Sequence, residues 1–251
     1  MERIDLLGVK ISAINMAQAL AEIDGWIAHR QPNYICVTPI HTIMDCYDDP
    51  KLREIYNHSG LTTPDGMPVV WWLQFHGKKW AERVYGPDLM LALCAHSIKP
   101  GYRHYFYGGT PAVLQSLEDN LVGRFEGLQV CGSYSPPFRP LTEEEDLEVI
   151  KRINQAAPDI LWVGIGSPRQ EYWMARHASR VKAPVLIGVG AAFDFLSGRK
   201  PQAPLWVRRA GLEWFFRLAS EPRRLWRRYL LGYPRFLFLL GLHQAGIIKI
   251  D

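Results

Sequence analysis

The sequence predicts an α/β protein with a mainly parallel, Rossmann-like sheet covered by helices on both faces, followed by a basic and aromatic helical appendage. Short apolar runs alternate with segments of helical periodicity as far as about residue 198. After that point tryptophan, phenylalanine and arginine dominate and the strand pattern stops. We therefore expect a Rossmann-like domain over residues 1–198 and an appendage of two or three short helices over residues 199–251.

Five apolar runs bounded by turn residues predict the strands. They are nearly continuous in apolar character, which is typical of parallel strands buried on both faces. The runs cover residues 34–38, 104–107, 128–131, 160–165 and 185–189. Ligands of such sheets bind at the carboxyl ends of the strands. The loops of interest are therefore 38–42, 108–110, 132–137, 164–170 and 188–194, whose glycines allow a close backbone approach.

Helical patterns fill most of the intervals between these strands, at residues 15–29, 50–58, 87–97, 111–122, 142–156 and 170–181. Several begin with clear signals. Asn15 can act as an N-cap, and Thr142 with Glu145 forms a capping box. Pro87 and Pro111 suit first helical positions. In the appendage, a helix over 205–219 should end before Pro222, which then begins a second one.

Composition places the chain among ordinary folded proteins, because 48% of its 251 residues are hydrophobic and 22% are charged. Its four cysteines show no C-x-x-C pairing, which argues against a disulfide framework and a zinc site. The start, Met1-Glu2-Arg3-Ile4-Asp5, lacks the basic region of a secretory signal, so we expect a cytoplasmic protein. Between residues 199 and 235, ten basic residues face two acidic ones, which predicts an anionic partner for that end.

Two glycine loops have the wrong pattern for a dinucleotide fingerprint. Residues 164–169 and 188–193 both lack the third glycine of G-x-G-x-x-G, and neither loop is followed by a Walker lysine. The sequence thus gives little support to NAD or ATP. A glycine loop that opens onto a helix N-terminus remains a general place for phosphate, although a tight turn without a ligand is an equally good interpretation.

Asp65 stands in a loop shaped by Pro64, Gly66 and Pro68, where a carboxylate could serve as a general base. Locally, an Asx-turn residue that bonds its own backbone is the more ordinary interpretation. Arg83 and Asp194 have equally ordinary interpretations, as a surface charge and a helix cap. The chain has no Asp-x-Asp pair of the kind that clamps a metal on a diphosphate, so arginines would have to stabilise such a group.

An ordered set of motifs resembles the WecG/TagA/CpsF glycosyltransferase family, also called family 26, over nearly the whole chain. The motifs are Val37-Thr38-Pro39, Thr63-Pro64-Asp65-Gly66-Met67-Pro68, Arg83-Val84-x-Gly86-Pro87-Asp88, Gly108-Gly109, Gly164-x-Gly166-x-Pro168-x-Gln170-Glu171, Gly188-Val189-Gly190-Ala191-x-Phe193-Asp194, Ser197-Gly198-x-x-x-x-Ala203-Pro204-x-Trp206 and Leu212-Glu213-Trp214-x-x-Arg217-Leu218-x-x-Glu221-Pro222-x-Arg224. The last of them is the most specific.

The resemblance implies an inverting enzyme that needs no metal or other cofactor. Such an enzyme moves N-acetylmannosamine, its uronic acid or glucose from a UDP-sugar to an undecaprenyl-diphosphate-linked acceptor, in the synthesis of bacterial surface polysaccharide or teichoic acid. The family often has Asn two residues after the threonine, whereas this chain has Ile40 followed by His41. The resemblance leaves open the sugar, the acceptor, the linkage position and the pathway.

The resemblance also implies roles for individual residues. Asp65 looks like the catalytic base, and Thr38, Arg83 and Gln170 look like residues that line the active site. The nucleotide side is expected to comprise Asp194 and the loop glycines Gly108, Gly109, Gly166 and Gly190. Three appendage arginines, Arg217, Arg224 and Arg227, look like the groups that close over the diphosphate.

The tail over residues 230–248 is apolar, but Pro234, Arg235 and His243 interrupt it, so we do not expect a spanning helix. Beside a basic aromatic helix, this tail favours peripheral association with the inner face of the cell membrane. Packing on the body or a homo-oligomer interface is the alternative. A nicotinamide-dependent or a non-catalytic Rossmann-like protein remains the competing function, whereas nucleic-acid binding is disfavoured because the aromatics are spaced for helix burial.

Overall fold

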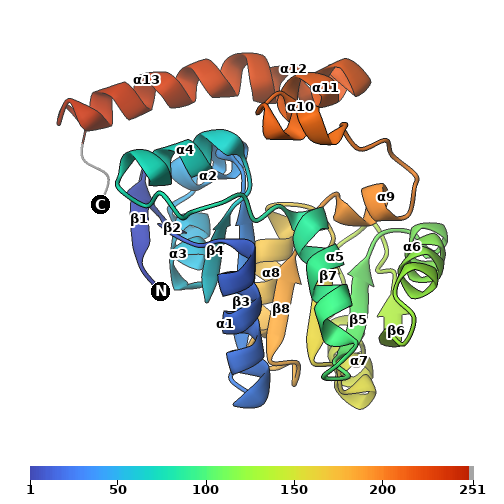
Figure 1. Ribbon diagram of the computed structural model, residues 1–251. Helices are drawn as coiled ribbons and strands as arrows, with labels where there is room; N and C mark the ends of the chain where they lie inside the picture. Colours follow the sequence, from blue (N-terminus) through green and yellow to red (C-terminus); the bar gives the residue numbers. More distant parts are fainter. Residues whose placement is uncertain (249–251) are drawn as a thin grey trace.

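The computed structural model describes residues 1–248 and contains a six-stranded parallel sheet in the order β4-β3-β8-β7-β5-β6 (Figure 1). The strands are β3 (Asn33–Thr38), β4 (Leu61–Pro64), β5 (Arg103–Gly108), β6 (Gln129–Tyr134), β7 (Ile160–Gly164) and β8 (Val185–Gly188). The predicted fold class is confirmed. The parallel arrangement brings the carboxyl ends of all six strands to one edge of the sheet.

Successive residues of each central strand enter two separate hydrophobic cores, one on each face of the sheet. In β3, Tyr34 and Cys36 belong to one core and Ile35 to the other. In β7, Leu161 and Trp162 divide in the same way. Because side chains alternate across a strand, a run that is apolar at every position must be covered on both faces.

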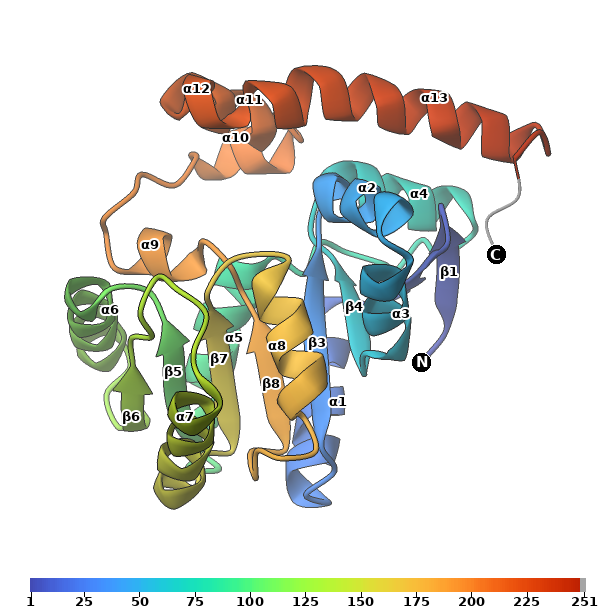
Figure 2. The same cartoon turned by 180° about the vertical axis from the view of Figure 1, so that it is seen from behind.

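Helices provide that cover (Figures 1 and 2). One core is closed by α1 (Met16–Ala28), α5 (Gly86–Ser97), α6 (Pro111–Arg124) and the short α9 (Ala192–Leu196). The other core is closed by α2 (Ile40–Asp48), α3 (Pro50–His58), α4 (Met67–Phe75), α7 (Glu143–Ala156), α8 (Arg169–His177) and a hairpin of β1 (Arg3–Leu6) and β2 (Val9–Ser12).

The helix-start signals act as the sequence predicts. Asn15 Oδ1 accepts a hydrogen bond from the Gln18 backbone N–H at 3.0 Å, and Thr142 with Glu145 forms a complete capping box. Pro87 and Pro111 lie in the first turns of α5 and α6. These local bonds satisfy N–H groups that a helix leaves without partners at its start.

The sequence reasoning missed several elements. It did not identify the β1–β2 hairpin, β4, α2 or α4, and it ended the strand at 131 whereas β6 continues to Tyr134. The expected loop over 38–42 was wrong in part, because α2 begins at Ile40 directly after the N-cap Pro39. β4 is only four residues long and half threonine, so its apolar signal is weak, although every one of its residues is buried at the sheet edge.

The appendage contains α10 (Leu205–Arg209), α11 (Glu213–Ser220), α12 (Pro222–Trp226), the π-helical turn η1 (Arg227–Leu231) and α13 (Gly232–Gln244). The helix predicted over 205–219 is not continuous. Gly211, at φ +74°, breaks it, because this left-handed conformation ends a helix. Pro222 begins α12 as predicted. Within residues 1–248, no helix has the length and apolar character required to cross a membrane.

These helices form a layer over the carboxyl edge of the sheet (Figures 1 and 2). A long connection leaves α9 and returns to α10, and α13 then runs back over α2. Phe236 of α13 is 4% exposed and joins the core on the α2 side. The edge where ligands of parallel sheets bind therefore has a helical roof.

Gly108 shows how tightly two strand ends approach at this edge. It has φ +131°, and a Cβ added there would lie 2.4 Å from the carbonyl oxygen of Gly164.

We expect Gly108→Ala to lower the free energy of unfolding by about 2–4 kcal/mol through strain and overpacking. Gly123→Ala is the matched control, because Gly123 lies within α6 with no atom within 4 Å of the added Cβ. It should stabilise by about 0.5–1 kcal/mol. Urea unfolding measures both, and equal effects would contradict this interpretation.

Candidate active site

A cavity of about 200 Å³ lies at the carboxyl edge of the sheet, beneath the appendage. Its floor comes from the residues that follow β3, β4, β7 and β8, and its roof includes arginines of the appendage. Its lining includes polar and charged side chains, those of His41, Thr42, Asp65, Tyr85, Ser167, Gln170, Glu171, Arg217, Arg224 and Arg228, and the glycines Gly166 and Gly190.

Asp65 directly follows β4, and its carboxylate is held by Arg83. The Asp65 backbone N–H donates to the Thr38 carbonyl at 3.3 Å, which joins the ends of β3 and β4. Arg83 Nη2 donates to Asp65 Oδ1 at 3.1 Å, and Arg83 Nε donates to the Asp65 carbonyl oxygen. Burial raises the pKa of Asp65 to about 6 against the opposing effect of Arg83. A buried carboxylate whose pKa is raised to this range can act as a general base.

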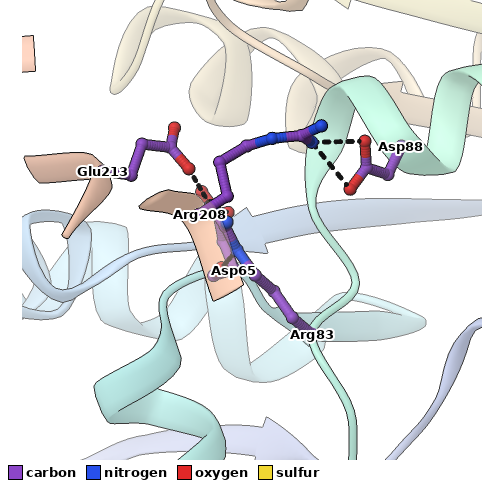
Figure 3. Close-up of polar contacts among 5 residues, drawn as sticks. All are labelled: Asp65, Arg83, Asp88, Arg208 and Glu213. Atoms are coloured by element: carbon purple, nitrogen blue, oxygen red, sulfur yellow. Dashed lines mark hydrogen bonds and ion pairs between the residues drawn. The ribbon is translucent and has the colours of Figure 1, made fainter. Parts of the chain in front are cut away.

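Glu213, at the start of α11, reaches the same arginine from the appendage. Arg83 Nη2 donates to Glu213 Oε2 at 2.7 Å, as the close-up in Figure 3 shows. Glu213 is only 8% exposed. Sequence reasoning did not single it out as a site residue. Its presence as one of two acids in a strongly basic segment was the available signal.

Three guanidinium groups, those of Arg217, Arg224 and Arg228, line the cavity opposite the strand ends. Arg217 and Arg224 were predicted there. Arg227 was also predicted, but it is not in the cavity lining: it is exposed and its guanidinium lies 5.3 Å from the ring centre of Trp226. Arg228 lines the cavity instead: it comes four residues, about one helical turn, after Arg224, so the two side chains lie on the same side of the helix. Permanently charged guanidiniums suit a diphosphate.

His41, which follows Ile40 at the expected departure from the family pattern, also lines the cavity. Burial, with Arg228 and Arg217 nearby, holds the pKa of His41 well below its ordinary value. The imidazole is therefore neutral near pH 7 and offers one donor and one acceptor. Sequence reasoning named this position but gave it no role.

Gln170 lines the cavity as predicted, yet both atoms of its amide are engaged with protein groups. Its Oε1 accepts from the Gly190 N–H at 3.0 Å, and its Nε2 donates to Glu171 Oε1 at 2.8 Å. Tyr56 donates to the same Glu171 oxygen at 3.2 Å. Burial raises the pKa of Glu171. The Gln170 side chain thus holds the Gly190 loop in place, and Gly166 and Gly190 both border the cavity.

Five other predicted residues are outside the lining of this cavity, and one of them is Arg83, which contacts the lining residue Asp65. Thr38 is fully buried, and its hydroxyl donates to the Cys36 carbonyl at 3.0 Å. Gly108 packs against Gly164. Gly109 and Asp194 instead line a neighbouring cavity of about 200 Å³ at the end of β7. The carboxylate of Asp194 pairs with Lys200 at 3.2 Å.

Within the described residues, no three side chains of His, Cys, Asp and Glu gather as a metal site requires. The cysteines are free thiols, of which Cys36, Cys46 and Cys94 are buried and Cys131 is half-buried. Arg83 already engages both Asp65 and Glu213.

Known proteins are similar to this chain over most of its length. Residues 4–247 match the model of the glycosyl transferase WecG/TagA/CpsF family. Three similar curated proteins are each described as N-acetylglucosaminyldiphosphoundecaprenol N-acetyl-beta-D-mannosaminyltransferase. One from Bacillus spizizenii is 27% identical over 237 residues, which cover 91% of this chain and 90% of the relative. One from Staphylococcus aureus strain MW2 is 25% identical over 249 residues, which cover 98% and 95%.

A third relative, from Bacillus subtilis strain 168, is 30% identical over 183 residues, which cover 73% of this chain and 69% of the relative. The family match extends from the β1–β2 hairpin through the appendage and includes both Asp65 and the arginines of the cavity roof. The chain therefore belongs to the WecG/TagA/CpsF family of glycosyltransferases.

Proposed function

We propose that this enzyme transfers N-acetylmannosamine from UDP to an undecaprenyl-diphosphate-linked sugar, with inversion, in surface polysaccharide or teichoic acid synthesis. The observation that carries the proposal is the placement of Asp65 in one cavity with Arg217, Arg224 and Arg228. A base and an anion-binding group are the two parts that such a transfer needs. The names of the relatives favour N-acetylmannosamine over its uronic acid or glucose.

In the proposed reaction, Asp65 takes the proton of an acceptor hydroxyl as that oxygen attacks the anomeric carbon from the face opposite UDP. A new carbon–oxygen bond forms while the bond to the diphosphate breaks, and UDP leaves with the electron pair. A single displacement of this kind inverts the anomeric centre. Arg83 holds the Asp65 carboxylate for this step.

Negative charge grows on the departing diphosphate, and we assign its stabilisation to Arg217 and Arg224, with Arg228 as the third group at the cavity. Guanidiniums can donate two hydrogen bonds to one phosphate and keep their charge at every working pH. In this proposal they take the role that a metal has in other nucleotide-sugar enzymes. Gly166 and Gly190 allow the ligand to approach the backbone, and Gly109 and Asp194 remain the predicted nucleotide side.

We further propose that residues 199–251 act as a unit that covers the active site and lies on the inner membrane surface, where the lipid acceptor is found. The outer side of η1 and α13 carries a stripe of exposed apolar residues: Leu230, Leu231, Leu237 and Phe238. Phe236 and the partly buried Leu239 and Leu240 pack toward the body. An apolar stripe within a basic segment suits an anionic lipid surface.

Replacing Asp65 with Asn should lower acceptor-dependent UDP release by about 10²–10⁴-fold and leave UDP binding unchanged, because only the proton acceptor is lost. For the wild type, the pKa raised to about 6 means that the ionised base accumulates between about pH 5 and 7. The kcat/KM for the acceptor should rise through that range. UDP release from a panel of UDP-sugars, with and without the lipid-linked acceptor, provides the measurement and identifies the donor. Normal turnover by Asp65→Asn would refute the assignment.

Arg224→Gln should reduce kcat by about 10²-fold, because a guanidinium that meets the leaving group acts mainly in the transition state. The matched control is Arg223→Gln, since Arg223 is the neighbouring exposed residue and is outside the cavity lining. A short-chain acceptor in detergent removes any membrane contribution from the assay. Equal losses in the two variants would show that general charge, rather than the position of Arg224, is responsible.

Substituting Leu237 and Phe238 together with Asp should strongly reduce co-sedimentation with phosphatidylglycerol vesicles, since both side chains are more than 60% exposed on the proposed lipid-facing stripe. Leu147→Asp is the control, because Leu147 is 56% exposed on α7, away from the appendage. Unchanged co-sedimentation would reject the membrane proposal. A change from a dimer to a monomer in analytical ultracentrifugation would assign the stripe to a second copy of the chain instead.

A further inference from the structure

The guanidinium of Arg83 has two carboxylate partners that come from different parts of the chain (Figure 3). One nitrogen, Nη2, donates to Asp65 at 3.1 Å and to Glu213 at 2.7 Å. The three side chains are 14%, 11% and 16% exposed for Asp65, Glu213 and Arg83, so solvent screens their interactions only weakly. The appendage carboxylate therefore has the closer contact with the arginine.

We propose that Glu213 is a positioning residue that competes with Asp65 for Arg83 and so keeps the Asp65 carboxylate basic enough to take the acceptor proton. The inference rests on the proposed function, in which Asp65 is the base. Glu213 is not among the residues that line the cavity. Its effect therefore passes through Arg83 rather than through contact with substrate.

The charges around Asp65 determine the direction of this effect. The groups that act on it are Arg83, Glu213, Arg217, Tyr85, Tyr229 and Tyr233, and its cavity is also lined by His41, Glu171, Arg224 and Arg228. Burial and the Glu213 charge raise the pKa of Asp65, whereas Arg83 and Arg217 lower it. The pKa values of the three tyrosines are raised by burial, so the tyrosines are neutral. Removing the Glu213 charge leaves Arg83 to Asp65 alone, which lowers the pKa of Asp65 and weakens the base.

A second ion pair between body and appendage provides a control. Arg208 Nη1 of α10 donates to Asp88 of α5 at 2.9 Å (Figure 3). The ion pairs of Arg83 are with Asp65 and Glu213, whereas Asp88 pairs with Arg208 and its side chain is 43% exposed. Asp88→Asn therefore weakens the attachment of the appendage without changing the charge beside the base. Both ties exist only while the appendage lies over the sheet edge, so the base has its proposed environment only in the covered site.

The experiment compares the pH dependence of kcat/KM for the acceptor in the full-length wild type, Glu213→Gln, Glu213→Asp and Asp88→Asn. Glu213→Gln keeps the size of the side chain and removes its charge. In this variant the acidic limb of the pH profile should move down by about one pH unit, and kcat on the plateau should fall about three- to tenfold. The KM for the UDP-sugar should stay within about twofold. Glu213→Asp, which keeps the charge, should restore the limb toward that of the wild type, and Asp88→Asn should leave it in place.

An unshifted acidic limb in Glu213→Gln would overturn the proposal. Equal losses of activity in Glu213→Gln and Asp88→Asn, without a shift of the pH profile in either, would also overturn it. That result would mean that Glu213 only attaches the appendage to the body. Thermal unfolding of each variant checks that the fold is retained. Turnover by Asp65→Asn distinguishes failure of the proposed function from failure of this inference. An active Asp65→Asn variant refutes the role of Asp65 as the base. An inactive Asp65→Asn variant, together with an unshifted pH profile for Glu213→Gln, refutes only the role of Glu213.

Discussion

The ion cluster around Arg83 is the interaction on which the organisation of this site depends. Arg83 is bound to Asp65, which follows a sheet strand, and to Glu213, which begins a helix of the appendage. A buried charge without its partner raises the free energy of the folded state. Two buried carboxylates that share one guanidinium are therefore stable only if all three groups are held at contact distance. The cluster thus links the covering of the sheet edge to the state of the proposed base.

The parallel sheet makes this cluster possible. Six strand ends lie along one edge of the sheet. The hydrogen bond from the Asp65 backbone N–H to the Thr38 carbonyl holds the loop of Asp65 beside the end of β3. On the opposite side of the cavity, α11, α12 and η1 supply the arginines. The charges divide accordingly: the body contributes the Asp65 carboxylate, the proposed base, and the basic appendage contributes cations suited to a diphosphate.

Much of the fold could be predicted because its signals are local. Five of the six strands of the sheet are apolar runs that suit burial on two faces, and the caps at Asn15 and Thr142 are bonds between residues three apart. β4 escaped prediction because its threonines resemble a loop, and α2 escaped because Pro39 precedes it at a strand end. The continuous appendage helix was wrong because Gly211 takes a left-handed conformation that periodicity does not report.

For the site, the sequence alone pointed to the loop around Asp65, the glycine loops at strand ends and the basic character of the appendage. Only the tertiary structure decided which arginines reach the cavity and which acid meets Arg83. Arg228, rather than Arg227, lines the cavity with Arg224, and Glu213 meets Arg83 across 130 positions of the chain. The physical reason is the range of the forces: propensity and capping act within a few residues, whereas a shared ion pair depends on how distant elements pack.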